Sequence, residues 1–112
     1  MLSEKPNQYE IWEVQLSPAV GHETKKNRPC VIISNNIINH RMMTVTIIPL
    51  TRTIKNVPFR VRSRLAGIEG EIMVDQIKTI DKSRLIRFVG RLDDRTIRLL
   101  DSVIFRMFTS SR

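Results

Sequence analysis

Five residues near the ends of apolar segments could together carry out acid-base chemistry on a phosphodiester: His22, Glu23, Arg28, Thr51 and Asp75. An imidazole titrates near neutrality, and a guanidinium offers a forked set of donors that matches phosphate oxygens. The chain shows no serine or cysteine nucleophile signature, so these residue types fit phosphodiester cleavage better than acyl transfer. RNA brings its own nucleophile, the 2′-hydroxyl. A solvent-exposed or purely structural pair of His22 and Glu23 is the other interpretation of the pattern.

Positive charge surrounds these residues. The chain has 112 residues and a formal net charge of +8. Neutralising phosphates with Lys and Arg releases condensed counterions, so such a chain favours a phosphate-rich partner, although charge alone does not distinguish DNA, RNA and a membrane surface. Between Thr24 and Ile68 there are nine basic residues and no Asp or Glu: Lys25, Lys26, Arg28, Arg41, Arg52, Lys55, Arg60, Arg62 and Arg64.

The composition also argues against several classes of protein. The longest apolar runs, such as residues 45–50, fall far short of the ~20 residues that a membrane-spanning helix needs. Residues 1–8 form a polar N-terminal tail with no signal-peptide pattern, and one cysteine forms no internal disulfide, so we expect a cytoplasmic protein. One Cys and two His do not make a zinc site, so we expect metal-independent catalysis and no cofactor. Cys30 precedes an apolar run, which favours a buried packing thiol over a nucleophile.

Alternation with a period of two predicts a single β-rich α+β domain over residues 1–112, with mostly antiparallel strands. Trp12, Val14 and Leu16 should share one face of the first strand. The loop at 17–28 is long and charged, and we expect it to be mobile. A helical turn is predicted near 35–39, Gly67 and Gly70 should frame a turn, and Asp81 should cap a turn at 81–85. The predicted strands are 11–16, 29–34, 44–50, 58–63, 71–77 and 86–92.

The strand at 58–63 predicts a row of arginines. If Phe59 and Val61 face inward, Arg60, Arg62 and Arg64 lie on the opposite, solvated face, about 7 Å apart. Such a row could follow a phosphate backbone, or it could be an ordinary solubilising face.

From Asp93 the period changes to that of a helix. Asp93 or Asp94 should cap its start. The apolar residues of this helix form one stripe along its surface, which predicts a core or dimer face rather than a cofactor site. The stripe consists of Ile97, Leu100, Ile104, Met107 and Phe108.

Three segments resemble signatures of the MazF/PemK family of growth-inhibiting endoribonuclease toxins. They are EIWEVQLSPAVGHETKKNRPCVIISN at 10–35, IPLT at 48–51 and VDQIKTIDKSRL at 74–85, and the resemblance spans about residues 9–108. It implies an SH3-like small barrel with a C-terminal α-helix, the CcdB/PemK-like toxin fold. It also implies a homodimeric toxin of a type II toxin-antitoxin system, a sequence-specific mRNA interferase that cleaves single-stranded RNA. A cognate acidic antitoxin would silence it, and DNA would be contacted only indirectly, through that antitoxin.

The resemblance also carries residue roles. Arg28 and Thr51 match the family positions proposed to act on the phosphate and the transition state. His22 and Glu23 match loop positions implicated in catalysis or RNA contact. We predict RNA binding by Asn35 and Gln76 from the resemblance, and by the basic residues Lys25, Lys26, Arg52, Arg60 and Arg62.

One departure affects the mechanism. Met73 stands where the PemK-like branch has a catalytic arginine, so Asp75 is either a base or a structural acceptor. Because guanidinium stays protonated at physiological pH, Arg28 is expected to be a phosphate clamp and proton donor rather than a base. The proton acceptor is then His22, Glu23 or Asp75.

Two other classes fit the same chain. One is a non-catalytic, protein-binding toxin of the gyrase-inhibitor type on the same fold, and the other is an inactive nucleic-acid-binding module. The basic loop with Arg28 argues against the first, because a surface that only binds protein does not need it.

Overall fold

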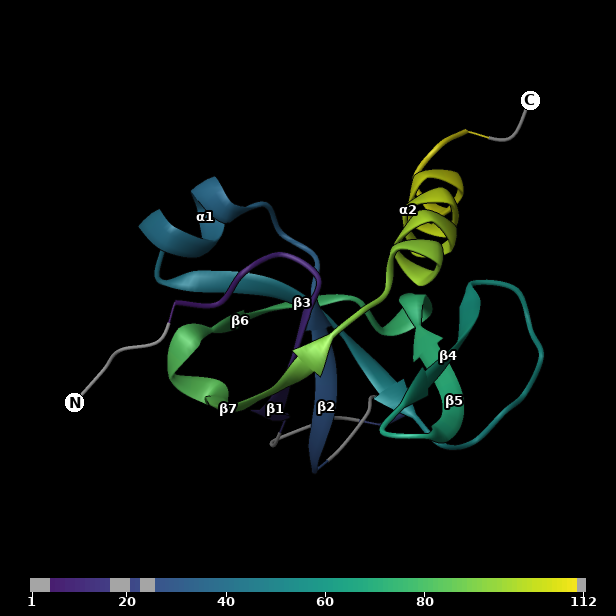
Figure 1. The fold of residues 1–112 in the computed structure, drawn as a ribbon. Helices are drawn as coiled ribbons and strands as arrows, with labels where there is room; N and C mark the ends of the chain where they lie inside the picture. The colour runs from purple at the N-terminus through teal and green to yellow at the C-terminus, as the bar shows by residue number, and fades with distance from the viewer. Residues whose placement is uncertain (1–4, 17–20, 23–25, 111–112) are drawn as a thin grey trace.

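The structure, a computed structural model, describes residues 5–16, 21–22 and 26–110 and is mostly β with one long C-terminal helix (Figure 1). The predicted β-rich class is therefore confirmed. The helices are α1 (Asn36–Arg41) and α2 (Asp94–Met107), and there are short 3-10 turns η1 (Val74–Gln76) and η2 (Lys82–Arg84). The strands are β1 (Glu10–Gln15), β2 (Asn27–Ile32), β3 (Thr44–Thr51), β4 (Arg60–Leu65), β5 (Ile68–Met73), β6 (Lys78–Asp81) and β7 (Leu85–Arg91).

The sheet curls around β3. In the described part of the chain the strands are antiparallel neighbours in the order β4-β5-β3-β2-β1-β7, and β6 adds to β3. One edge of β3 pairs with β2. The other edge is divided, because residues 44–47 pair with β6 and residues 50–51 pair with β5. Two strands that leave one edge in succession bend the sheet toward a half-barrel, which agrees with the predicted small barrel.

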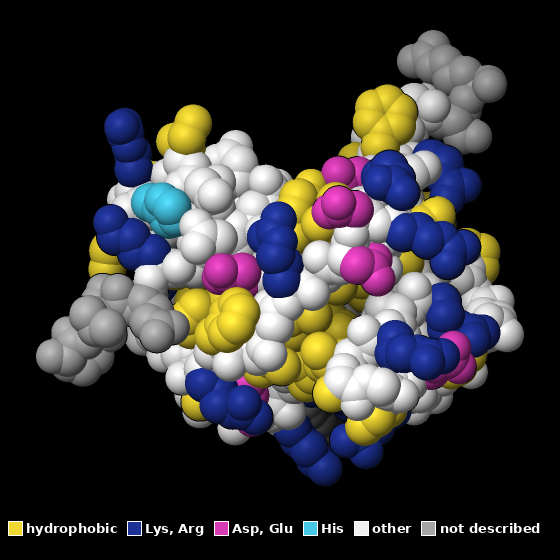
Figure 2. Space-filling model, viewed as in Figure 1, with side chains coloured by type: hydrophobic (Ala, Val, Ile, Leu, Met, Phe, Trp, Pro, Cys, Tyr) yellow, Lys and Arg dark blue, Asp and Glu magenta, His cyan; other side chains and the backbone are white. Residues whose placement is uncertain are grey.

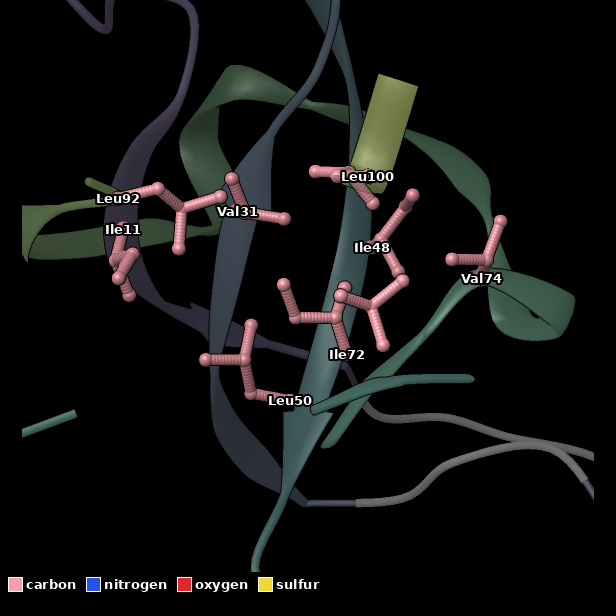
Figure 3. Packing of buried hydrophobic residues seen from close by; sticks show 9 residues of the cluster. Ile11, Val31, Ile48, Leu50, Ile72, Val74, Leu92 and Leu100 are labelled. Atoms are coloured by element: carbon pink, nitrogen blue, oxygen red, sulfur yellow. The ribbon is translucent and has the colours of Figure 1, made fainter. Parts of the chain in front are cut away.

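Each face of the sheet carries its own hydrophobic cluster. Alternate residues of β1 belong to different clusters, as the period of two requires: Ile11 lies in the first cluster, and Trp12 and Val14 lie in the second with Leu16. Figure 3 shows the first cluster, in which Leu100 of α2 lies over Ile48 of β3. The second also contains Cys30, which is fully buried, and burial raises the pKa of its thiol to about 12. Cys30 is a packing residue, as predicted.

Short polar side chains cap the helices and turns. The Asp93 carboxylate accepts a hydrogen bond from the Thr96 N–H at 2.7 Å, and Asp81 accepts one from the Ser83 N–H at 2.8 Å. These bonds favour the charged carboxylates and hold the pKa of Asp93 and of Asp81 below the usual range. Asn35 caps α1 in the same way, with its side-chain oxygen 3.1 Å from the Ile38 nitrogen. The predicted caps at Asp81 and Asp93 are confirmed.

Helix α2 packs its apolar stripe on the first cluster. Leu100 is fully buried there, and Ile97, Ile104 and Met107 pack around it. Phe108, the last residue of the predicted stripe, is the C-terminal cap of the helix and is 65% exposed, so it does not pack on this cluster. None of the described helices is long and apolar enough to span a membrane.

The β4–β5 hairpin differs from its prediction. Phe59 was expected to face inward, but it has a left-handed φ of +64° and is 42% exposed, because β4 begins only at Arg60. The next strand was predicted to start at Glu71 and run to Ile77. Instead β5 starts at Ile68 and ends at Met73, where η1 begins. Gly67 does lie in the turn, with φ of +78°, whereas Gly70 lies inside β5.

The described end of the predicted N-terminal tail lies against the domain. Pro6 is buried. The Gln8 backbone donates to the Asn36 side chain at 2.7 Å, and its side-chain amide donates to the Ile33 carbonyl at 2.9 Å. The chain is therefore attached to α1 and the end of β2 before the first strand begins.

Candidate active site

A cavity of about 440 Å³ opens at the end of the sheet where β2 begins, β3 ends and the β4–β5 hairpin turns. Basic side chains gather along the corresponding lower rim of the molecule in Figure 2. The cavity combines cations, hydroxyls and an apolar wall, and Glu69 is its acidic member. The cations are Lys26, Arg28 and Arg52, the hydroxyls are Thr51, Thr53 and Ser63, and the wall includes Pro29, Leu50, Leu65 and Ile68.

Strands β2 and β3 place Arg28 and Thr51 in the lining of the same cavity. Cys30 is opposite Pro49 in this antiparallel ladder. Beyond this last pair of the ladder, β2 and β3 each extend two residues toward the cavity, to Arg28 and Thr51. The half-buried Arg28 and the half-buried Thr51 both line the cavity.

The Thr51 hydroxyl is oriented by the loop that follows it. Its oxygen accepts a hydrogen bond from the Thr53 backbone N–H at 3.2 Å. A hydroxyl that accepts such a bond keeps its own proton to donate. Thr51 can therefore act as a donor to a group bound in the cavity.

Gly70 allows β5 to cross close to Thr51. A Cβ atom at Gly70 would overlap the carbonyl oxygen of Thr51, so only glycine fits without a shift of backbone. Both Thr51 and Gly70 line the cavity at this point.

The loop predicted to carry the acid-base pair is described only in part. His22 is exposed and does not line the cavity. Glu23 and Lys25 lie outside the described residues. The Leu16 N–H donates to the Lys26 carbonyl at 3.3 Å, which joins the two ends of this loop beside the cavity. Lys26 itself lines the cavity.

Asp75 forms a two-pronged ion pair instead of facing the cavity. Its carboxylate accepts from Arg60 Nε at 2.7 Å and from a terminal nitrogen of Arg60 at 3.1 Å. Partial burial of Asp75 acts to raise its pKa, but hydrogen bonds from Arg60 and Gln76 outweigh it and hold the pKa below the usual range. The bond to Asp75 raises the pKa of Arg60 in turn. This geometry matches the structural acceptor among the two roles considered for Asp75.

The predicted row of solvated arginines is wrong for Arg60. Its side chain is only 11% exposed, and it lies between Asp75 and the buried Glu71, whose carboxylate oxygen is 3.9 Å away. Arg62 and Arg64 are exposed, but both approach Glu69, at 3.8 Å and 3.2 Å. The acids that follow the basic stretch in sequence return beside it across the hairpin.

The two residues predicted to contact RNA from the resemblance lie apart from the cavity lining. Asn35 is exposed at the start of α1, where its side chain caps the helix. Gln76 is half-buried in η1 and hydrogen-bonds to Asp75. The structure therefore joins Arg28, Thr51, Lys26 and Arg52 in one cavity and leaves Asn35 and Gln76 outside it.

Sequence reasoning missed Gly70 and Glu71. Glu71 is only 2% exposed although it sits among the apolar residues of β5. A charged residue directly before the apolar run Ile72-Met73-Val74 is a usable signal, since a buried carboxylate requires partners. Its partners come from the β3–β4 loop and β4, which periodicity does not reveal.

The family described as PemK-like, MazF-like toxin of type II toxin-antitoxin system matches residues 7–108. The chain belongs to this family. Among curated MazF/PemK relatives, endoribonuclease MazF9 of Mycobacterium tuberculosis is 32% identical over 105 residues, which cover 85% of this chain and 89% of the relative. Endoribonuclease EndoA of Bacillus subtilis is 30% identical, with coverage of 85% and 87%.

Solved structures of the MazF/PemK family share the fold. MazF from Deinococcus radiodurans superposes with a TM-score of 0.84 at 20% identity, over 94% of this chain and 97% of that one. An endoribonuclease from a Mycobacterial species, solved in complex with its cognate antitoxin, gives a TM-score of 0.75 over 93% of each chain at 20% identity. The predicted toxin family and fold are confirmed.

Proposed function

We propose that this chain is the toxin of a type II toxin-antitoxin pair and acts as a metal-independent endoribonuclease on single-stranded RNA, using the RNA 2′-hydroxyl as nucleophile. The meeting of Arg28 and Thr51 in a cavity lined by two further cations carries this proposal. The names of the curated relatives support it. Cleavage at preferred sequences is part of the proposal, as is a cytoplasmic location, which agrees with the single buried thiol.

In the proposed reaction the 2′-hydroxyl attacks the adjacent phosphorus, and the 5′-oxygen leaves, which gives a 2′,3′-cyclic phosphate. Negative charge grows on the phosphoryl oxygens in the transition state, where preorganised donors are most effective. Arg28 clamps these oxygens and hydrogen-bonds the leaving 5′-oxygen, which takes up a proton from water and departs as a 5′-hydroxyl. The Thr51 hydroxyl donates beside it.

The proton of the 2′-hydroxyl must also be taken up. Asp75 is a poor base here, because its pKa is lowered and both its oxygens face Arg60. We therefore assign the acceptor to His22 or Glu23. The segment that carries them begins and ends beside the cavity, at Leu16 and Lys26.

Two partners complete the proposal. A homodimer is supported by the exposed apolar residues of the α2 region, since Leu99, Phe105 and Phe108 are 48%, 69% and 65% exposed. An acidic, partly disordered segment of the antitoxin would lie over the cationic cavity and compete with RNA. Its association should slow steeply as the Debye length shrinks from ~10 Å at 0.1 M to ~3 Å at 1 M salt.

Incubation of the full chain with a long unstructured RNA in EDTA, followed by sequencing of the ends, tests this function. The expected result is cleavage at discrete sites with cyclic or 3′-phosphate ends, and no cleavage of DNA of the same sequence. Binding of RNA without cleavage would identify a binding module instead. Intact RNA that the folded protein does not bind would favour the gyrase-inhibitor type of toxin.

A further inference from the structure

Glu71 is a buried carboxylate that the proposed reaction does not use. It lies in β5 directly opposite Thr51 of β3, and it is 2% exposed. Among the described residues, its Oε1 is the buried side-chain oxygen without a hydrogen-bond partner, with Arg60 3.9 Å away. Burying a charge with incomplete pairing costs free energy, and an apolar residue would suit this strand better. Its presence calls for a role that an apolar side chain does not fill.

The other oxygen of Glu71 holds the β3–β4 loop (residues 52–59). Oε2 accepts hydrogen bonds from the backbone N–H groups of Lys55 and Asn56, at 3.2 Å and 2.9 Å. Asn56 has a left-handed φ of +55°, which asparagine tolerates better than most residues, and its side-chain oxygen accepts from Arg62 at 2.8 Å. The loop lies outside β4 and β5 in Figure 1, and these bonds tie it back to the sheet.

The hydrogen bonds to Glu71 restrict the conformations open to the residues that follow Thr51. Thr51 is held in the β3–β5 ladder and residues 55–56 are held at Glu71, so only three residues, 52–54, lie between the two points. Two of the three, Arg52 and Thr53, line the cavity. Thr53 also donates the backbone bond to the Thr51 hydroxyl. The positions of the Arg52 side chain and of the Thr51 hydroxyl are thus linked to the Glu71 carboxylate through this loop.

We propose that Glu71 is a positioning residue for the active site, holding the β3–β4 loop so that Thr53 orients Thr51 and Arg52 faces the cavity. The proposal rests on the proposed ribonuclease function. Arg60, whose terminal nitrogen lies 3.9 Å from Glu71 Oε1, is the positive charge beside the buried carboxylate, and Arg62 holds the loop from the other side through Asn56.

The test compares Glu71→Ala with Glu71→Gln. Alanine removes the acceptor, whereas glutamine keeps one oxygen that can accept from Lys55 and Asn56. In Glu71→Ala we expect faster amide hydrogen exchange at Lys55 and Asn56, and a single-turnover cleavage rate lower by about tenfold, since small misplacements of catalytic groups are costly. Glutamine should restore amide protection and bring the rate to within about threefold of the wild type.

Glu13→Ala is the matched control, because it also removes a carboxylate paired with an arginine, Arg87, but outside the cavity lining. It should leave both readouts as in the wild type. If Glu71→Ala does not fold, Asn56→Ala loosens the same loop without touching the core and should also slow cleavage. A folded Glu71→Ala protein that cleaves as fast as the wild type would overturn the proposal, as would protected Lys55 and Asn56 amides in that variant. If the wild type cleaves no RNA, the function fails, while the exchange measurement still tests the loop.

Discussion

Two groups of basic residues come from the same acid-free stretch of sequence and end in different surroundings. The cavity group (Lys26, Arg28 and Arg52) lies where β2 begins and β3 ends, and lines one cavity with Thr51. The hairpin group (Arg60, Arg62 and Arg64) lies on β4, where Glu69, Glu71 and Asp75 meet it. Figure 2 shows basic and acidic side chains side by side over β4 and β5.

The comparison shows that a stretch of sequence rich in basic residues does not necessarily form a positively charged surface. The acids that neutralise the hairpin group follow the acid-free stretch by only a few residues, and the antiparallel hairpin folds them back onto it. Ion pairing leaves this group less suited to hold phosphates than the sequence suggested. The cavity group lies beside the hydroxyl that the chemistry needs.

The largest effect should come from the cavity group. Arg28→Ala removes the phosphate clamp and Thr51→Ala removes a donor, so each should lower the RNA cleavage rate by about 10²-fold or more. Arg64→Ala removes an exposed arginine that pairs with Glu69 and should change the rate by less than about threefold. Gel-based cleavage rates with circular dichroism spectra check this. Near-wild-type cleavage by folded Arg28→Ala would mean that another cation binds the phosphate.

The second largest effect should come from substitution at Gly70, where β5 approaches β3 between the two groups. Gly70→Ala places a Cβ against the Thr51 carbonyl, so it should lower the free energy of unfolding by roughly 1–3 kcal/mol, the usual cost of overpacking. Gly90→Ala is the control, because a Cβ there meets no atom within 4 Å. Urea unfolding of both variants measures the difference. Equal stability of the two would show that β5 does not need glycine for its approach to β3.

A smaller effect should distinguish the cavity group from the hairpin group in the salt dependence of RNA binding. Arg52→Ala should reduce the slope of log affinity against log salt by about 1, as expected for one lost phosphate contact. Arg60→Ala and Arg62→Ala should reduce it less, because both arginines have acidic partners. Fluorescence anisotropy with an uncleavable RNA analogue at several salt concentrations provides the slopes. If Arg52→Ala and Arg62→Ala reduced the slope equally, the hairpin group would have to be counted as part of the RNA-binding surface.

The smallest effect concerns the Arg60–Asp75 pair. Because the native pKa of Asp75 is lowered, the pair stabilises the protein above about pH 4, and this stabilisation is lost as the pH falls through the native pKa. Asp75 is 39% exposed, so solvent screening limits the contribution to less than ~1 kcal/mol. Asp75→Asn should therefore be slightly less stable than the wild type at neutral pH and equally stable near pH 2. A difference that grew toward low pH would contradict this assignment.

The sequence predicted what depends on local pattern. The alternating faces of β1, the existence of β2 and β3 and the caps at Asp81 and Asp93 follow from neighbours in the chain, and they were predicted correctly. The resemblance to known toxins singled out Arg28 and Thr51, which line one cavity in the structure. Periodicity failed around β4, where the left-handed Phe59 ends the alternation just before the strand begins.

The features that the sequence did not predict depend on the register between strands that are distant in the chain. The pairing of Arg60 with Asp75, the close approach at Gly70 and the loop contacts of Glu71 join residues that are 15 or more positions apart in the sequence. Each depends on how β5 is set against β3 and β4, which no local pattern encodes. The functional residues that were missed are the ones that only this register creates.

The central claim is that the cavity promotes attack by the RNA's own 2′-hydroxyl. Its most direct test uses a short RNA that contains one mapped cleavage site, alongside the same oligonucleotide with a single 2′-deoxy nucleotide on the 5′ side of the scissile phosphate, both in EDTA. The account predicts a 2′,3′-cyclic phosphate product from the RNA and no cleavage at the substituted position, with binding retained. Cleavage of the deoxy-substituted strand at that phosphate would contradict it, because the nucleophile would then come from the protein or from water.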